Sequence, residues 1–231
     1  MISVMCNLMY IFFFRIIKTP VLVCSVFFLM HVMAADDFTP VTDINAGLLS
    51  IDSKRKTIAT VQGSFIQKKV SAVFNKEIIQ NGVYYSGSGS RLRWELRDPQ
   101  QYVVFILGER IYYSENNRTR ELPKGQSRMF QMIGENMLGT IGGTQSGFKT
   151  ELFENDVLYK VCMTPAGRRA ARGMKGVELI LSKETGATRE VRILDSDTEY
   201  TLIQFITAEI NKDIDESLFI PGKIPASAEK K

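Results

Sequence analysis

Strict alternation of apolar and charged side chains is the feature that most restricts what this chain can fold into. It is clearest over residues 91–97, where the apolar members are Leu92, Trp94 and Leu96. The charged members are Arg91, Arg93, Glu95 and Arg97. A period of two places alternate side chains on opposite faces of a β-strand. We therefore predict a strand with one buried face, and we expect the charged members to face water.

Similar short runs, separated by turn-forming residues such as Gly108-Glu109 and Asn116-Asn117, extend over most of the chain. The predicted strands are residues 64–70, 78–85, 91–97, 102–107, 110–114, 119–122, 148–153, 157–164, 177–182, 190–194 and 200–210. About ten or eleven antiparallel strands joined by short turns favour an open or closed barrel. A helix is predicted before them over residues 44–60, with Thr42 or Asp43 as its N-cap.

A second helix is predicted in the middle of the strands, over residues 128–141. Apolar side chains recur there at helical spacing, and methionines widen the stripe. The stripe contains Met129, Phe130, Met132, Ile133, Met137 and Ile141. Such a helix either plugs a core or forms a movable lid over an apolar cavity. Methionine is unbranched and polarizable, so it adapts to variable apolar ligands, and several glycines that follow the helix would provide a hinge.

If the second helix is a lid, the strands beneath it supply the wall of a cavity. The predicted lining consists of Tyr84, Leu92, Trp94, Leu96, Phe105, Leu107, Ile111 and Tyr113. Each of these side chains could equally be part of an ordinary core. The two interpretations are compatible, because the wall of a carrier's cavity belongs to its core.

The first 34 residues have the pattern of an export signal. Arg15 and Lys18 precede residues 21–33, which are almost wholly apolar, and Ala34 ends a stretch suited to signal peptidase. We expect cleavage near Ala34, a periplasmic location and a single domain over residues 35–231. A second apolar stretch before Arg15 leaves open that the segment stays on the chain as an anchor.

Removal of this signal would take most reactive side chains with it. His31 is the single histidine, and Cys6 and Cys24 also lie in the signal, which leaves Cys162 as the one cysteine. Without a histidine, a Ser-His-Asp catalyst and a histidine-based metal site are excluded. Two carboxylate pairs, Glu95 with Asp98 and Asp195 with Asp197, are placed on a wet strand face and in a turn. We therefore expect no enzyme activity, no cofactor and no metal.

The charge of the chain also narrows the classes of partner. Of 29 basic residues two lie in the signal, which leaves 27 against 25 acidic ones. So small a surplus argues against nucleic-acid binding. A basic loop over residues 167–176 is either a solvated turn or a contact for an acidic partner or an anionic membrane.

Several segments, taken in order, resemble the LolA family of outer-membrane lipoprotein carriers. The segments are residues 61–67 (VQGSFIQ), 82–85 (GVYY), 92–96 (LRWEL) and 219–221 (FIP), with Asn211 and Ile214 before the last. The resemblance covers roughly residues 48–221. It departs from the family pattern at Ser88, where a basic residue that helps govern lid closure is expected.

The resemblance implies an incomplete antiparallel β-barrel of about eleven strands with an N-terminal helix and a helical lid. It also implies a monomeric periplasmic carrier that receives acylated lipoproteins from an inner-membrane releasing complex and delivers them to an outer-membrane acceptor. Two other hypotheses remain: a periplasmic sensor or interaction domain with the same fold, and a carrier of another acylated lipid in a biosynthetic pathway.

Overall fold

The computed structural model describes residues 37–71, 76–123, 130, 134, 141, 147–167 and 174–222. The predicted export signal, four of the predicted lid residues (Met129, Met132, Ile133 and Met137) and most of the basic loop lie outside the described residues. Among the described residues, no helix is long and apolar enough to cross a membrane.

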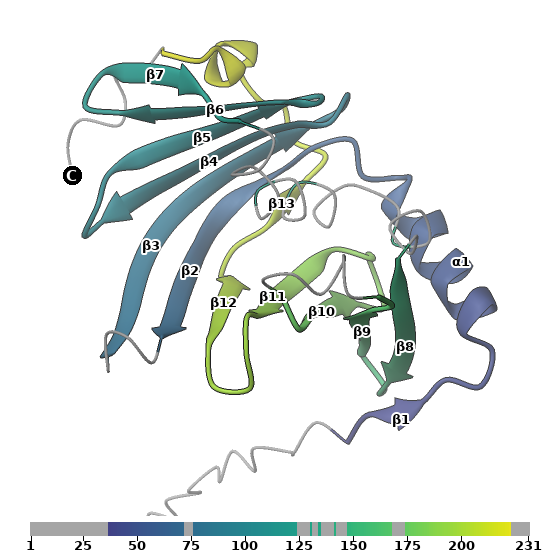
Figure 1. The fold of residues 1–231 in the computed structure, drawn as a ribbon. Coiled ribbons are helices and arrows are strands. Elements are labelled where there is room, and N and C mark those ends of the chain that lie inside the picture. Colours follow the sequence, from purple (N-terminus) through teal and green to yellow (C-terminus); the bar gives the residue numbers. More distant parts are fainter. Residues whose placement is uncertain are drawn as a thin grey trace, which may run out of the picture. The chain divides into compact units, whose positions relative to one another are not determined.

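The described part of the chain is built mainly of β-strands, with the N-terminal helix α1 between the two-residue strand β1 and the remaining strands (Figure 1). Its elements are β1 (Thr39–Pro40), α1 (Ile44–Arg55), β2 (Val61–Ser71), β3 (Lys76–Gly87), β4 (Arg91–Asp98), β5 (Tyr102–Leu107), β6 (Arg110–Glu115), β7 (Arg118–Glu121), β8 (Phe148–Glu154), β9 (Leu158–Pro165), β10 (Gly176–Ser182), β11 (Thr188–Leu194), β12 (Tyr200–Phe205), β13 (Glu209–Ile210) and the 3₁₀ helix η2 (Glu216–Phe219). The prediction of a mainly β fold with an N-terminal helix is confirmed.

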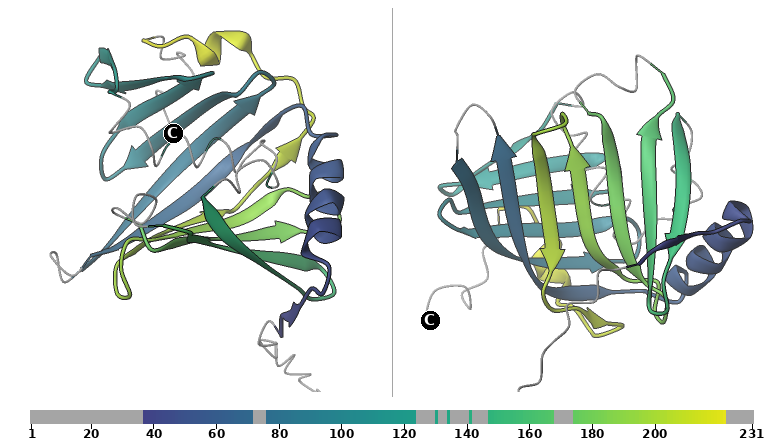
Figure 2. Two further views of the ribbon diagram at one scale, coloured as in Figure 1. Left: turned by 45° about the vertical axis from the view of Figure 1, so that its right-hand side comes forward. Right: turned by 90° about the horizontal axis from the view of Figure 1, so that it is seen from below.

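All strands belong to one antiparallel sheet of 13 strands in the order β1-β8-β9-β10-β11-β12-β2-β3-β4-β5-β6-β7, with β13 paired to β2. The pairing of β12 with β2 joins the N-terminal and C-terminal groups of strands. In the part of the chain that the structure describes, β7 does not pair back to β1, so the sheet stays open. It is strongly curved, and its two halves face each other across a concave side (Figure 2). The expected incomplete barrel is thereby confirmed.

Most strand boundaries lie within three residues of the prediction, and two elements differ from it more clearly. Helix α1 begins as expected, with the Asp43 side chain accepting a hydrogen bond from the Ala46 N–H at 2.9 Å, but it ends at Arg55 instead of residue 60. The β-branched residues that follow, Thr57 and Ile58, are poor helix formers. The last predicted strand is divided into β12 and β13, because the N–H groups of Ile206 and Thr207 both reach the Ser64 carbonyl.

Candidate functional site

The register of the sheet fixes which side chains share its concave face. Trp94 of β4 is directly opposite Tyr84 of β3 and Val104 of β5. Because directly paired residues project on the same side of a sheet, these side chains form one row. The row continues from Val104 to Tyr113 of β6. It crosses the strands that carry most of the predicted cavity lining.

Four aromatic side chains form a cluster on this face: Phe65, Tyr84, Trp94 and Phe205. The ring of Trp94 stacks on Phe65 with centroids 3.7 Å apart, and Phe205 meets both Tyr84 and Trp94 edge to face at 5.0 and 6.1 Å. Gly82 makes the stack possible, because a Cβ atom there would lie 2.2 Å from Cζ of Phe65. We call these four residues the aromatic cluster.

Hydrogen bonds satisfy most polar groups near the aromatic cluster. The Tyr84 hydroxyl donates to the Thr207 carbonyl at 3.0 Å, and the Gln67 amide donates to the Gln80 amide oxygen at 3.0 Å. Burial raises the pKa of the Tyr84 hydroxyl well above its ordinary value. Trp94 is the exception, because its indole Nε1 has no acceptor within the described residues. An unpaired buried donor is uncommon in folded proteins.

The other half of the sheet continues the apolar surface. Val161, Leu179 and Val191 lie on adjacent strands in direct register, and each is at most 1% exposed. Ile203 connects this row to β2, where its partner is Gln67. Buried residues of both halves belong to one apolar cluster. The concave face is therefore mainly apolar across both halves of the sheet, with Gln67 and Gln80 as a hydrogen-bonded polar pair on it.

The described residues of the predicted lid contact this surface. A Cβ atom on Gly134 would lie 2.9 Å from Cδ1 of Ile106 and 3.9 Å from Cδ2 of Leu92, both on the concave face. Phe130 packs against the apolar cluster, and Ile141 is completely buried. The Ile141 N–H donates to Oδ1 of Asp52 in α1 at 2.8 Å. Gly134 therefore lies over the concave face, Phe130 packs against the apolar cluster, and Ile141 is bound to α1.

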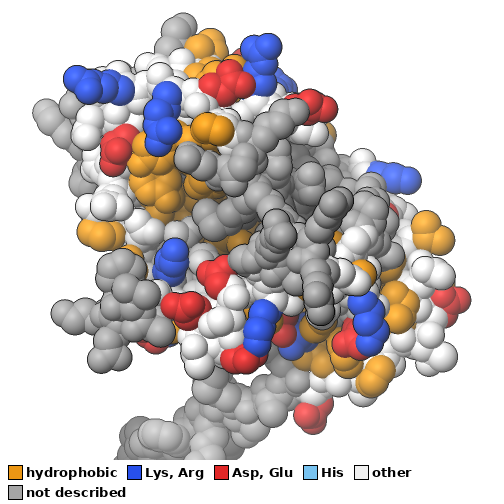
Figure 3. Space-filling model, in the orientation of Figure 1, with side chains coloured by type: hydrophobic (Ala, Val, Ile, Leu, Met, Phe, Trp, Pro, Cys, Tyr) orange, Lys and Arg blue, Asp and Glu red, His pale blue; other side chains and the backbone are white. Residues whose placement is uncertain are grey.

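The concave face is less deeply buried towards one end of the sheet. The rings of Tyr102 of β5 and Tyr113 of β6 are in contact, tilted by 31° with centroids 5.2 Å apart, and both residues are only partly buried. Burial raises the pKa of Tyr102 to about 12. In the space-filling view, hydrophobic side chains gather between charged ones at the upper left, where Figure 1 has β4 to β6 (Figure 3).

The register separates the predicted lining into two groups. Those on the concave face are Tyr84, Leu92, Trp94, Leu96, Ile111 and Tyr113. Placing Phe105 and Leu107 with them was wrong: they are opposite Arg93 and Arg91 and lie on the convex face. Strand β5 is apolar on both faces, so its sequence pattern did not show which of its side chains lie on the concave face. Phe65, Phe205, Val104 and Ile106 belong to the concave face and were missing from the predicted lining.

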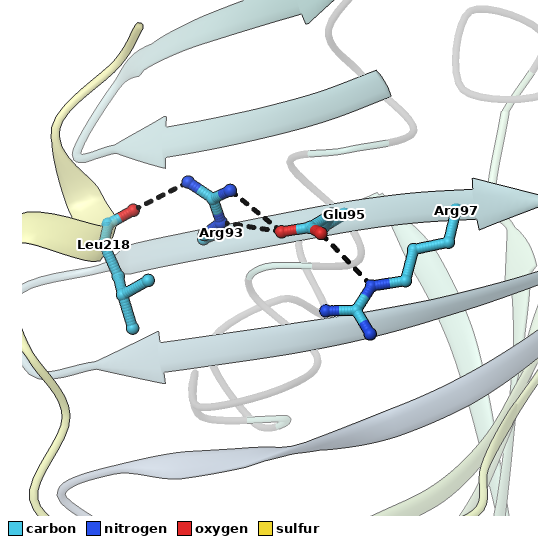
Figure 4. A network of polar contacts seen from close by, with 4 residues as sticks. All are labelled: Arg93, Glu95, Arg97 and Leu218. Carbon is cyan, nitrogen blue, oxygen red and sulfur yellow. Dashed lines mark hydrogen bonds and ion pairs between the residues drawn. The ribbon is translucent and has the colours of Figure 1, made fainter. Parts of the chain in front are cut away.

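The expectation that Arg93 and Glu95 face water was also wrong. Arg93 is 0% exposed, with its guanidinium 5.2 Å from the centre of the Phe105 ring. It donates to Glu95 at 2.8 Å and to the Leu218 carbonyl of η2 at 3.3 Å, while Arg97 donates to the other oxygen of Glu95 at 3.2 Å (Figure 4). The C-terminal segment therefore covers a part of the convex face that the alternation assigned to solvent.

Outside the concave face, the remaining candidates are dispersed. Cys162 is half-buried and opposite Glu178 on the convex face, where burial raises the pKa of its thiol. Burial also raises the pKa of Asp195 in the turn after β11. The described residues contain no group of three or more histidine, cysteine, aspartate or glutamate side chains that could hold a metal ion.

Comparison with protein families agrees with this architecture. Residues 56–221 match the model of the family described as outer membrane lipoprotein carrier protein LolA. The chain belongs to the LolA family. The match runs from the end of α1 through η2, and so includes the whole aromatic cluster and both halves of the sheet. No curated protein sequence matches the chain.

Solved structures with this fold are distant in sequence from this LolA-family member. An uncharacterized conserved protein from Thermus thermophilus is 11% identical with a TM-score of 0.50, over 79% of this chain and 95% of that one. MucB in the Pseudomonas aeruginosa MucA/MucB complex is 16% identical with a TM-score of 0.48, over 76% of this chain and 60% of that one. The LolA superfamily protein NE2245 from Nitrosomonas europaea is 10% identical with a TM-score of 0.44, over 76% and 96%. These likenesses concern the fold alone.

Proposed function

We propose that this protein is a periplasmic carrier that binds the acyl chains of lipoproteins on its concave face and carries them from the inner to the outer membrane. Membership of the LolA family supports this function. The observation that carries it is the mainly apolar concave surface, over which Gly134 lies and against whose apolar cluster Phe130 packs.

The energetics of acyl chains explain why such a surface needs a cover. Each CH₂ group moved from water into an apolar site contributes about 0.8 kcal/mol, so a palmitoyl chain exposed to water costs roughly 12 kcal/mol. A lipoprotein therefore cannot cross an aqueous compartment with bare chains. An empty carrier pays a similar free-energy cost if its own apolar surface is exposed to water. The segment that contains Phe130, Gly134 and Ile141 lowers this cost by packing on the concave face when cargo is absent.

In this structure part of the concave face is covered. Leu92 and Trp94 are 2% and 1% exposed, and Gly134 lies against Leu92. Acyl chains reach these side chains only when the segment that contains Phe130, Gly134 and Ile141 moves off them. Loading then replaces contacts between this segment and the sheet with contacts between the acyl chains and the sheet. Delivery requires an acceptor that holds the chains more tightly.

A release experiment tests this function. Spheroplasts that display lipoproteins on the inner membrane are incubated with the purified protein, and the soluble fraction is analysed by mass spectrometry for lipoproteins bound to it. We expect soluble complexes with the natural sequence. The variant Leu92→Asp should form none, because it puts a charge in the apolar wall.

A matched variant and a fold measurement make the result interpretable. Ile79→Asp introduces the same charge at a side chain that is 55% exposed and should load normally. Circular dichroism checks that Leu92→Asp is folded, and Leu92→Phe, which adds bulk to the apolar wall without a charge, replaces it if it is not. If neither a lipoprotein nor any other acylated lipid is carried by the natural sequence, the carrier function is refuted.

A further inference from the structure

The indole of Trp94 is a buried hydrogen-bond donor without an acceptor. The residue is 1% exposed, and no acceptor among the described residues reaches its Nε1 atom. An indole N–H can only donate, so a second donor cannot satisfy it. A native protein keeps very few such groups, and each requires an explanation.

The surroundings of Trp94 make its unpaired donor more informative. Its neighbour Tyr84 also carries one polar hydrogen into the aromatic cluster, and that hydrogen is bound to the Thr207 carbonyl. Gln67 and Gln80 satisfy each other on the same face. A further unpartnered polar atom, the Thr150 hydroxyl oxygen of β8, lies on the concave face of the other half, since Thr150 is opposite Met163.

The position of the Trp94 ring is fixed by its contacts. It stacks on Phe65 at 3.7 Å and meets the edge of Phe205 at 6.1 Å, while strand pairing holds its backbone between β3 and β5. A donor held in this way is oriented before any ligand arrives, so the indole itself loses little entropy when an acceptor binds to it. The ring supplies apolar contact area, and its edge supplies one polar point.

We propose that Trp94 is a specificity-determining residue: its Nε1–H donates a hydrogen bond to an ester or amide carbonyl oxygen of the acylated ligand. The concave face would then distinguish acyl chains, which carry a carbonyl at the head of the hydrocarbon, from plain alkyl chains of equal length. This inference rests on the proposed carrier function and names the chemistry that the site prefers.

The apolar neighbourhood favours a neutral acceptor over an anion. Phe65 and Phe205 enclose the ring, and moving a phosphate or carboxylate into such surroundings requires removal of its hydration shell. A carbonyl oxygen accepts a hydrogen bond without that cost. It is also the polar atom that every esterified or amide-linked acyl chain carries next to its first methylene group.

The test compares two ligands that differ in their carbonyls. One is a short cysteine lipopeptide whose thioether-linked glycerol carries two palmitoyl esters, and the other carries two hexadecyl ethers on the same peptide. Binding of each to the full chain is measured by competition against a fluorescent palmitoyl lipopeptide. We expect the ester to bind about three- to tenfold more tightly than the ether, the usual net effect of one hydrogen bond.

Two variants locate the origin of the preference. Trp94→Phe keeps an aromatic ring but removes the donor, and it should bring the ester-to-ether ratio to about one. Tyr84→Phe is the matched control: it also removes one polar hydrogen from the aromatic cluster, but that hydrogen is already bound to Thr207. Tyr84→Phe should leave the ratio as in the natural sequence, whatever it does to either affinity.

Because Trp94 is the single tryptophan of the chain, its indole gives a direct spectroscopic readout. The ¹⁵N–¹H resonance should move downfield with the ester ligand and not with the ether ligand. Equal affinity for the two ligands in the natural sequence, or an ester preference that survives in Trp94→Phe, would overturn the inference and leave the carrier function intact. Failure of both ligands to bind would refute the carrier function together with it.

Discussion

The backbone N–H of Ile141 donates a hydrogen bond to the carboxylate of Asp52, which lies on helix α1 and is 89 residues away in sequence. Ile141 is completely buried and Asp52 is 7% exposed. This contact attaches the segment that contains Phe130, Gly134 and Ile141 to helix α1 at Ile141. Its strength should help determine how readily the concave face opens.

Replacement of Asp52 tests this role. Asp52→Ala leaves a buried N–H without its acceptor, which typically costs about 1–3 kcal/mol. We expect a lower unfolding temperature, faster hydrogen exchange at the Ile141 amide and faster uptake of a fluorescent acyl ligand. Asp52→Asn retains an acceptor oxygen and should restore most of the protection at Ile141. Equal exchange rates in the natural sequence and in Asp52→Ala would show that the contact does not hold the segment.

Gly82 should tolerate no larger residue. A Cβ atom there would lie 2.2 Å from Cζ of Phe65 and 2.5 Å from the Glu95 carbonyl, so Gly82→Ala must displace the stack of Phe65 on Trp94 or the backbone of β4. Overpacking of this kind costs about 1–3 kcal/mol. Urea unfolding followed by Trp94 fluorescence should show that loss together with a changed native emission spectrum. Gly167→Ala, where nothing lies within 4 Å of the added atom, should change the free energy of unfolding by less than about 0.5 kcal/mol.

The two arginines that share Glu95 should contribute unequally to stability. Arg93 has a side chain that is 0% exposed, whereas that of Arg97 is 47% exposed. Removing one partner of a buried ion pair costs about 3–5 kcal/mol, while an exposed pair contributes about 0–1 kcal/mol. We expect Arg93→Ala to destabilise the protein strongly and to loosen η2, which Arg91 still holds through Glu216 and Phe219, and Arg97→Ala to have little effect. Similar losses for the two variants in chemical denaturation would contradict the assignment.

Alkaline pH should weaken the packing around Tyr102. Burial raises the pKa of this hydroxyl from 10.0 to about 12, so the unfolded chain loses the proton at lower pH than the folded chain. The contribution of Tyr102 to stability is therefore complete below pH 10 and is lost as the pH rises towards 12. Unfolding temperatures measured across this window should fall less steeply for Tyr102→Phe than for the natural sequence. Identical slopes would show that Tyr102 does not titrate as its burial implies.

Local alternation predicted the concave face where the pattern had two distinguishable sides. Leu92, Trp94 and Leu96 alternate with charged residues, so the buried side of β4 followed directly from the sequence. Strand β5 has no polar side, and only its pairing with β4 shows that Phe105 lies with Arg93. For this strand the periodicity carried no information about orientation.

Contacts between distant segments explain the other differences. Arg93 is buried because Leu218 and its neighbours, 125 residues later, pack over it. Phe65 and Phe205 meet because β12 pairs with β2, a closure that no local pattern marks. Whether the indole N–H of Trp94 has an acceptor likewise depends on all the side chains that surround it in the folded protein. Such features arise from the assembled sheet, and local sequence patterns do not contain them.

The free edges at β1 and β7 have a mechanical consequence. A closed barrel has a radius set by its number of strands and their stagger, and it cannot widen without breaking inter-strand hydrogen bonds. A sheet with two ends can instead uncurl slightly while every ladder stays intact. Under the proposed carrier function, we expect the concave face to widen for bulkier ligands. The edge strand β7 is short and its side chains, which include Arg118 and Arg120, are exposed; such charged edge residues disfavour pairing with the edge of a second copy.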